Sequence, residues 1–206
     1  MHAFAKVLVV EDEALVRACY LRILVGGQCQ VREVGNGADA LQLMQQQAFD
    51  VVLLDIAMPG MDGLDVLQTL RRDWPGLPVL MLSTYPEKQY AVRCIKLGAG
   101  GYLNKSAAPD DMVAAVRKVA SGGMYVTPAT AEALATAMGA SATRAGAGTV
   151  EALSHREHQV FRLLTAGHTV SEIGAQLGLA SNTVSTYRQR ILEKTGTKND
   201  VELALY

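Results

Sequence analysis

The sequence predicts an α/β domain built on a parallel sheet, followed by a small all-helical domain. In the first ~120 residues, five short apolar runs alternate with five helical patterns, as in parallel sheets with helices on both faces. The last ~55 residues contain no strand pattern and carry several helix-start signals in series. With 206 residues, the chain is long enough for two such domains.

The predicted strands are short and rich in branched apolar residues, which fit a pleated and buried surface. They span residues 6–10, 31–34, 51–54, 79–82 and 101–103. Apolar residues at helical spacing predict the intervening helices over 13–25, 38–47, 63–73, 86–97 and 109–120. Pro86 opens the fourth of these helices, at a position where its missing N–H costs nothing.

The composition changes after residue 123, which indicates a boundary between domains. Residues 127–138 have helical spacing, with Thr127 as the cap of the helix. Residues 139–150 are rich in Gly, Ala, Ser and Thr, as flexible linkers are. We therefore expect a first domain over 1–123, a helix and linker over 124–149, and a second domain over 150–206.

The second domain carries repeated signals for the starts and ends of helices. The starts pair a capping residue with a glutamate three positions later: Ser154 with Glu157, Thr169 with Glu172 and Asn199 with Glu202. The glycines that should end helices are Gly167, Gly178 and Gly196. These signals predict helices over 155–166, 170–177, 182–195 and 199–206. A tight turn over 178–181 joins the second to the third, which is typical of a helix-turn-helix.

Polar residues follow the predicted strands in a consistent pattern. They are Glu11 and Asp12 after the first strand, Asp55 after the third, Ser83 and Thr84 after the fourth, and Lys105 after the fifth. In a sheet of order 2-1-3-4-5, the first and third strands are neighbours, so the three carboxylates should face one another. Each residue alone is explained more simply as a helix cap or a surface charge. Their combination at the strand ends indicates a site.

The chemistry of this site follows from its charges. Close carboxylates need a cation or a proton, and an all-oxygen set without His or Cys suits Mg²⁺. We expect Asp55 to attack phosphorus as a nucleophile. Mg²⁺ and Lys105 would then stabilise the transferring phosphoryl group, and Ser83 would hydrogen-bond one of its oxygens.

The same residues carry a family resemblance over roughly residues 5–121. The motifs VLVVEDE, VVLLDIAMPGMDG, VLMLST and GGYLNKSA resemble the receiver domain of two-component response regulators. The resemblance implies that Asp55 accepts a phosphoryl group from a partner histidine kinase or phosphotransfer protein. It also implies that Asp12, Asp55 and the backbone carbonyl of Ala57 bind Mg²⁺, with Glu11 acting through water.

The resemblance further implies which residues respond to phosphorylation. Ser83 takes the position of the switch hydroxyl, with Thr84 as the competing residue, and Lys105 takes that of the site lysine. Tyr102 takes the position of the aromatic switch. Alternation along its strand points Tyr102 away from Leu103, toward the helix that follows the fourth strand.

The net charge of −1 hides an uneven distribution of charge along the chain. Four bases lie close together on the third helix of the second domain and just after it: Arg188, Arg190, Lys194 and Lys198. Binding to nucleic acid needs such a local stripe rather than a basic total. Val184, Ile191 and Leu192 share one face of this helix and should pack on the rest of the domain. A solvated polar face would look similar, so charge alone does not decide.

Residues 151–206 resemble the LuxR-type helix-turn-helix in LSHRE, the Glu172–Ile173 pair and NTVSTYRQRILEKTG. Receiver followed by LuxR-type module is the domain order of the NarL/FixJ class, which implies a regulator that binds double-stranded DNA as a homodimer. By this resemblance, Ser185, Thr186 and Gln189 would face bases, whereas Tyr187, Arg188, Arg190 and Lys194 would contact phosphates or steer the helix toward them. Gly174 stands where the family usually has alanine, and we expect it to cost about 1 kcal/mol of helix stability.

The sequence thus predicts a phosphorylation-switched transcription regulator in the cytoplasm, with no enzymatic turnover. The apolar runs fall below the ~20 residues that a membrane helix needs, so we expect no membrane segment. A phosphohydrolase with an aspartate nucleophile would need an acid where the chain has Ala57, and no GxGxxG motif supports a dinucleotide enzyme. An output through protein contacts, or a switch independent of phosphate, stays an alternative.

Overall fold

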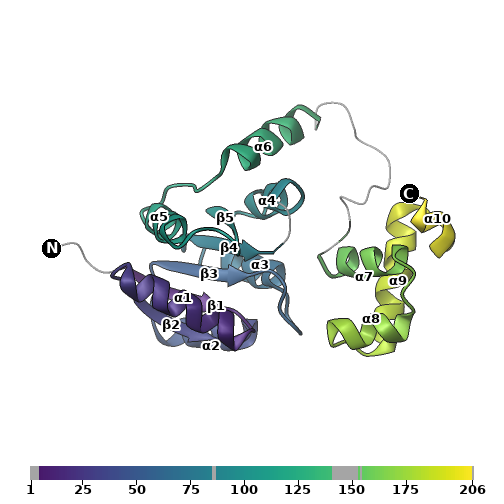
Figure 1. Cartoon of the computed structure of the whole chain (residues 1–206), viewed down its shortest axis with the longest axis horizontal. Coiled ribbons are helices and arrows are strands. Elements are labelled where there is room, and N and C mark those ends of the chain that lie inside the picture. Colours follow the sequence, from purple (N-terminus) through teal and green to yellow (C-terminus); the bar gives the residue numbers. More distant parts are fainter. Residues whose placement is uncertain (1–4, 85–86, 141–152, 154, 206) are drawn as a thin grey trace. The chain divides into compact units, whose positions relative to one another are not determined.

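A computed structural model describes residues 5–84, 87–140, 153 and 155–205, and the chain divides into two compact units. The first unit is Met1–Ala142 and the second is Thr143–Tyr206. A sheet with flanking helices forms the first unit, whereas the described residues of the second contain helices and no strand (Figure 1). The three-part division at 123 and 149 stays a prediction.

The first unit confirms the predicted five-stranded parallel sheet, in the order β2-β1-β3-β4-β5. Its strands are β1 (Lys6–Val10), β2 (Gln30–Val34), β3 (Val51–Asp55), β4 (Val79–Ser83) and β5 (Gly101–Asn104). In the pairing of β1 with β3, Val10 lies opposite Leu54. Glu11 and Asp55, which come directly after these two residues, therefore lie next to each other at the same edge of the sheet.

The helices of the first unit are α1 (Ala14–Gly26), α2 (Gly37–Gln46), α3 (Gly63–Asp73), α4 (Glu87–Lys96), α5 (Pro109–Ala120) and α6 (Pro128–Ala140). Glu13 has an extended backbone and occupies the N-cap of α1, so this helix begins one residue later than predicted. The expected role of Pro86 lies outside the described residues. Gly139 and Ala140 end α6 instead of opening a linker, and residues 141–150 also lie outside.

Two apolar cores cover the two faces of the sheet. One packs strand residues against α1 and α5, and includes Val9, Leu53, Leu82, Leu103, Leu24 and Val116. The other packs them against α2, α3 and α4, and includes Leu8, Leu54, Met81, Met44, Leu67 and Cys94. Because side chains alternate along a strand, Glu11, Asp55 and Lys105 continue the α1/α5 face at the ends of their strands.

The chain after α5 belongs to the first unit and lies along β5. The backbone N–H of Tyr125 donates to the carbonyl of Gly100 at 2.9 Å, and Tyr125 forms a parallel bridge with Gly101. Thr127 then caps α6 as predicted, accepting a hydrogen bond from the N–H of Thr130 at 3.2 Å. Helix α6 packs against α4. Among the described residues, no helix combines the length and apolar character that a membrane crossing requires.

The second unit contains α7 (His155–Thr165), α8 (Val170–Leu177), α9 (Ser181–Thr195) and α10 (Asp200–Ala204). Thr169 and Glu172 form the predicted capping box at the start of α8. Asn199 caps α10 through a 2.9 Å hydrogen bond from the N–H of Glu202. The third predicted cap, Ser154, lies outside the described residues. Gly178 and Gly196 end their helices with φ of 64° and 72°, in the left-handed region that favours glycine.

Gly174 has a second role, in the turn after α8, that the sequence did not indicate. A Cβ at this position would lie 2.7 Å from the carbonyl oxygen of Leu179, in the turn after α8. The N–H of Leu179 also donates to the carbonyl of Gly174 at 2.8 Å. The glycine therefore allows the turn to close tightly on α8, which offsets its cost to the helix.

Gly63, at the start of α3, lies directly against the backbone that follows β3. A Cβ there would lie 2.8 Å from Ile56 Cα and closer still to the carbonyl oxygen of Asp55. We expect Gly63→Ala to lower the free energy of unfolding by about 2 kcal/mol or more, because backbone has to move. Denaturant unfolding measures the change.

Gly26→Ala is the matched control, because nothing lies within 4 Å of a Cβ at the end of α1. This substitution should leave stability unchanged or raise it slightly. Equal stabilities of the two variants would contradict the close approach.

Candidate functional site

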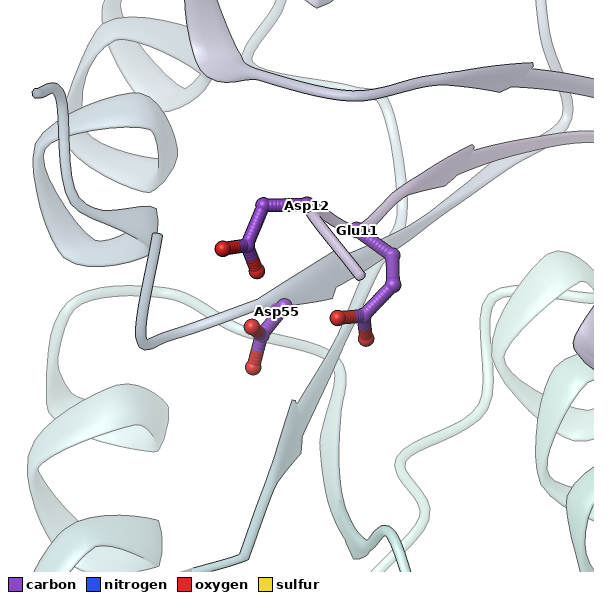
Figure 2. A group of neighbouring side chains, drawn as sticks. All are labelled: Glu11, Asp12 and Asp55. Carbon is purple, nitrogen blue, oxygen red and sulfur yellow. The ribbon is translucent and has the colours of Figure 1, made fainter. Parts of the chain in front are cut away.

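Three carboxylates converge where β1 and β3 end. Oxygen atoms of Glu11, Asp12 and Asp55 lie within 4.8 Å of one another, and Figure 2 shows the three side chains gathered at one place. Glu11 and Asp55 are 0% and 1% exposed, whereas Asp12 is half-buried. The strand order brings these acids together, as we expected from their positions after neighbouring strands.

Lys105 provides the positive charge of this pocket. Its Nζ lies 2.7 Å from Oε2 of Glu11 and 3.1 Å from Oδ2 of Asp55. The residue directly follows β5, and its backbone N–H donates to the carbonyl of Ser83 at 2.8 Å. Lys105 therefore links the ends of three different strands.

Burial and charge shift the pKa values of these groups. Burial raises the pKa of Asp55, although the Lys105 ammonium opposes this. Burial also raises the pKa of Glu11, and the charge of Asp55 raises it further. Burial by itself would lower the pKa of Lys105, but the two carboxylates outweigh it and raise that pKa. Burial therefore disfavours the charged form of both acids, and the Lys105 ammonium favours it.

The donor set of the pocket fits a hard divalent cation. It consists of carboxylate oxygens, and no His or Cys belongs to this group of described residues. Glu11 Oε2 and both carboxylate oxygens of Asp55 are buried, and the Lys105 ammonium is the cation that contacts Glu11 Oε2 and Asp55 Oδ2 in the described part of the chain. Such oxygens match the ligands that hard cations such as Mg²⁺ prefer.

Two residues that the sequence did not single out fix the backbone around this site: Arg17 fixes the acidic pair, and Asp62 fixes the start of α3. Arg17 of α1 donates from Nη1 to the carbonyls of Glu11 at 2.7 Å and Asp12 at 3.2 Å. Asp62 is 3% exposed and caps α3 by accepting the N–H groups of Leu64 and Asp65, both at 2.9 Å. The only sequence signal was the placement of Asp62 before the helix pattern at 63–73.

Ser83, Thr84 and Tyr102 lie around the ends of β4 and β5. Ser83 is the last residue of β4 and is 1% exposed, whereas Thr84 is exposed. Tyr102 is fully buried in a core that also contains Tyr90 and other residues of α4. Because Leu103 belongs to the opposite core, Tyr102 and Lys105 lie on opposite faces of the sheet.

In the second unit, α9 separates an apolar from a polar face. Val184 and Ile191 are buried and Leu192 packs against the same core, as predicted. The three residues predicted to face nucleobases are exposed, and so is Arg190: Ser185, Thr186 and Gln189 share the solvent side of the helix with this arginine. The helix thus presents short polar side chains and a cation to solvent.

The other predicted contact residues of α9 have partners inside the unit. Nε of Arg188 donates to the Asp200 carboxylate at 2.8 Å and 3.0 Å. Nζ of Lys194 donates to the buried Glu157 at 2.6 Å. Tyr187 packs against the core of the unit. Among the described residues, Arg190 has no ion pair.

Family models match both units. The response regulator receiver domain matches residues 7–117, and the bacterial regulatory proteins of the luxR family match residues 151–206. The chain is 37% identical to the response regulator UvrY of Escherichia coli K12 over 199 residues, covering 96% of this chain and 90% of that protein. It is also 37% identical to the response regulator GacA of Pseudomonas aeruginosa over 202 residues, covering 97% and 94%.

Solved structures share the fold. The response regulator ChrA of a heme-sensing two-component system has a TM-score of 0.54 at 29% identity, covering 98% of this chain and 95% of that chain. RcsB of Salmonella enterica serovar Typhimurium, bound to the promoter rprA with the phosphomimetic BeF₃⁻, has a TM-score of 0.61 at 21% identity. That match covers 99% of this chain and 98% of the other.

The pKa shifts of the acidic pocket generate a prediction about pH and Mg²⁺. Raised folded-state pKa values mean that protonation of Asp55 and Glu11 stabilises the fold at low pH, and that this stability is lost as pH rises through those values. Mg²⁺ needs the charged carboxylates, so its stabilising effect should grow over the same range. Thermal unfolding between about pH 5 and about pH 8, with EDTA or with Mg²⁺, measures both effects.

Asp55→Asn should reduce the Mg²⁺ effect and its pH dependence, whereas the exposed Asp65→Asn should change neither. A Mg²⁺ stabilisation that is the same at both ends of the range would contradict a site made of these acids.

Proposed function

Because the chain belongs to the response regulators that join a receiver domain to a LuxR-type DNA-binding domain, we propose that phosphorylation of Asp55 is its input. Proteins of this family are DNA-binding transcriptional regulators of two-component systems, and so is this chain. One observation carries the assignment of Asp55. Its buried carboxylate lies between two other acids and the ammonium of Lys105.

In the proposed reaction, a carboxylate oxygen of Asp55 attacks phosphorus of a phosphohistidine on a partner kinase or phosphotransfer protein. A bond from phosphorus to this oxygen forms, the bond from phosphorus to the imidazole nitrogen breaks, and its electron pair stays on the imidazole. Asp12, Asp55 and the backbone carbonyl of Ala57 would hold Mg²⁺, with Glu11 acting through water. When bound, Mg²⁺ neutralises charge on the phosphoryl oxygens.

The acyl phosphate would then redistribute the contacts of the pocket. Nζ of Lys105 already lies 3.1 Å from the Asp55 carboxylate. A phosphoryl oxygen on Asp55 can therefore form an ion pair with the Lys105 ammonium in place of the carboxylate. We propose that the Ser83 hydroxyl donates to another phosphoryl oxygen. A shift of the β4 and β5 ends would repack Tyr102 against α4, and this two-state face would carry the signal onward.

The output that we propose is control of DNA binding. Two copies of 150–206 would occupy two half-sites, with Ser185, Thr186 and Gln189 facing bases and Arg190 contacting phosphate. Arg188, Lys194 and Tyr187 would reach phosphates while their contacts inside the unit fix their orientation. Residues 124–149 would connect the two domains.

Ala57 stands where a phosphohydrolase with an aspartate nucleophile needs an acid, so we assign no turnover of phosphate esters to the receiver. Because its target is bacterial-type promoter DNA, we place the protein in the cytoplasm.

The role of Asp55 predicts the effect of a small phosphodonor. With acetyl phosphate and Mg²⁺, the full chain should gain affinity for a DNA fragment selected from its genome, and Asp55→Asn should lose that whole gain. Fluorescence anisotropy of the labelled fragment measures the affinity. Asp65→Asn, an exposed acid on α3, should behave like the unmodified chain. A full gain in Asp55→Asn would overturn the assignment.

The exposure of Arg190 predicts a change in the salt dependence of DNA binding. Arg190→Ala should weaken binding to all sequences and reduce the slope of log affinity against log salt by about 0.9, because one phosphate contact is lost. Gln189→Ala should instead reduce discrimination between sequences by about 1–3 kcal/mol.

Arg162→Ala, on the exposed side of α7, is the control for the loss of a positive charge. An unchanged slope in Arg190→Ala would contradict the phosphate contact. DNA binding with no salt dependence, or no DNA binding, would favour an output through protein contacts.

A further inference from the structure

Helix α1 carries a buried hydroxyl next to the acidic pocket. Tyr20 is 3% exposed and belongs to the core that packs α1 and α5 against the sheet, with Val9 and Leu53. Its Oη is buried and has no hydrogen-bond partner among the residues that the structure describes. A buried hydroxyl without a partner is unfavourable, and phenylalanine would fill the same space without this cost.

Two observations place this hydroxyl near the carboxylates. Side chains of a helix tilt toward its N-terminus, and α1 begins at Ala14, just after the acidic pair. Burial raises the pKa of Tyr20, and the charges of Glu11 and Asp55 raise it further. The core that Tyr20 shares with Val9 and Leu53 thus places its ring on the sheet face that carries Glu11, Asp55 and Lys105.

In the resting pocket, Lys105 occupies the nearby acceptors. Its ammonium lies 2.7 Å from Oε2 of Glu11, on the same carboxylate that influences Tyr20. If Lys105 pairs with a phosphoryl group on Asp55, Glu11 loses this ion pair, while its carboxylate stays buried and its Oε1 keeps the N–H of Glu13 at 3.3 Å. The loss of the ammonium leaves Oε2 of a buried carboxylate able to accept a further hydrogen bond.

We propose that Tyr20 is a positioning residue of the phosphorylated state, whose hydroxyl donates a hydrogen bond to the Glu11 carboxylate when Lys105 turns to the phosphoryl group. This inference rests on the proposed function of Asp55. The unpaired hydroxyl disfavours the resting state, and its hydrogen bond favours the phosphorylated state. Both effects shift the equilibrium between the resting and the phosphorylated state toward the phosphorylated state.

The test compares the full chain with Tyr20→Phe, using BeF₃⁻ with Mg²⁺ as the probe. Tyr20→Phe should bind BeF₃⁻ about tenfold more weakly, the effect of one hydrogen bond to a charged acceptor. Fluorine NMR of the bound ion measures this affinity. Denaturant unfolding of the resting protein should show Tyr20→Phe to be as stable as the unmodified chain or more stable. A merely structural role would lower stability and leave the affinity unchanged.

A second measurement reports on the hydroxyl directly. In protein with isotope-labelled tyrosine rings, the ring-carbon signal that Tyr20→Phe lacks should shift on addition of BeF₃⁻, as expected for a new phenol hydrogen bond. Tyr125→Phe is the control, because Tyr125 borders the same core. It should match the unmodified chain in affinity.

The outcomes separate this inference from the function on which it rests. If the unmodified chain does not bind BeF₃⁻, or Asp55→Asn binds it equally well, the proposed function fails and the inference fails with it. If binding requires Asp55 but Tyr20→Phe binds with unchanged affinity, or the Tyr20 signal does not move, the inference alone is overturned.

Discussion

The pairing of Lys105 with two buried carboxylates is the interaction on which the receiver depends. Glu11 and Asp55 are almost inaccessible to solvent, and each would be strongly unfavourable in that position without a cation. One ammonium serves both, at 2.7 Å and 3.1 Å, and so joins the ends of β1, β3 and β5. A cation held by two anions is also easily redirected when a third anion arrives. The same contacts thus stabilise the resting pocket and prepare it to respond.

The sequence was sufficient for those parts of the site that depend on strand order. Apolar runs alternating with helices predicted a parallel sheet, and the order 2-1-3-4-5 then placed the acids together. Alternation along a strand was enough to put Tyr102 on the α4 side. Contacts between distant backbone atoms could not be predicted in this way. Arg17 acts through carbonyls, and Gly63 matters because α3 touches the peptide after β3, which no local pattern indicates.

In the DNA-binding unit, the number of bases along α9 could not predict which of them have partners, because those partners are distant in the sequence. The stripe of bases was evident, but two of its members bind acids that lie 12 and 37 residues away, Asp200 and Glu157. These ion pairs tie α9 to α10 and α7, and leave Arg190 as an exposed base on the helix. The count of bases therefore overstates the charge that is free for DNA. The polar face toward solvent, set by helical periodicity alone, was predicted correctly.

The bridge between Tyr125 and Gly101 has a consequence for domain exchange. A Cβ on Gly101 would lie 2.7 Å from the carbonyl oxygen of Tyr125, so the segment after α5 lies directly against the start of the edge strand β5. Helix α6 follows and covers α4. A chimaeric regulator joined at residue 123 would lack this segment and α6, and would expose the edge of β5 and the surface of α4. Engineered sensors built on this receiver should keep the chain through Ala140 before attaching a new output module.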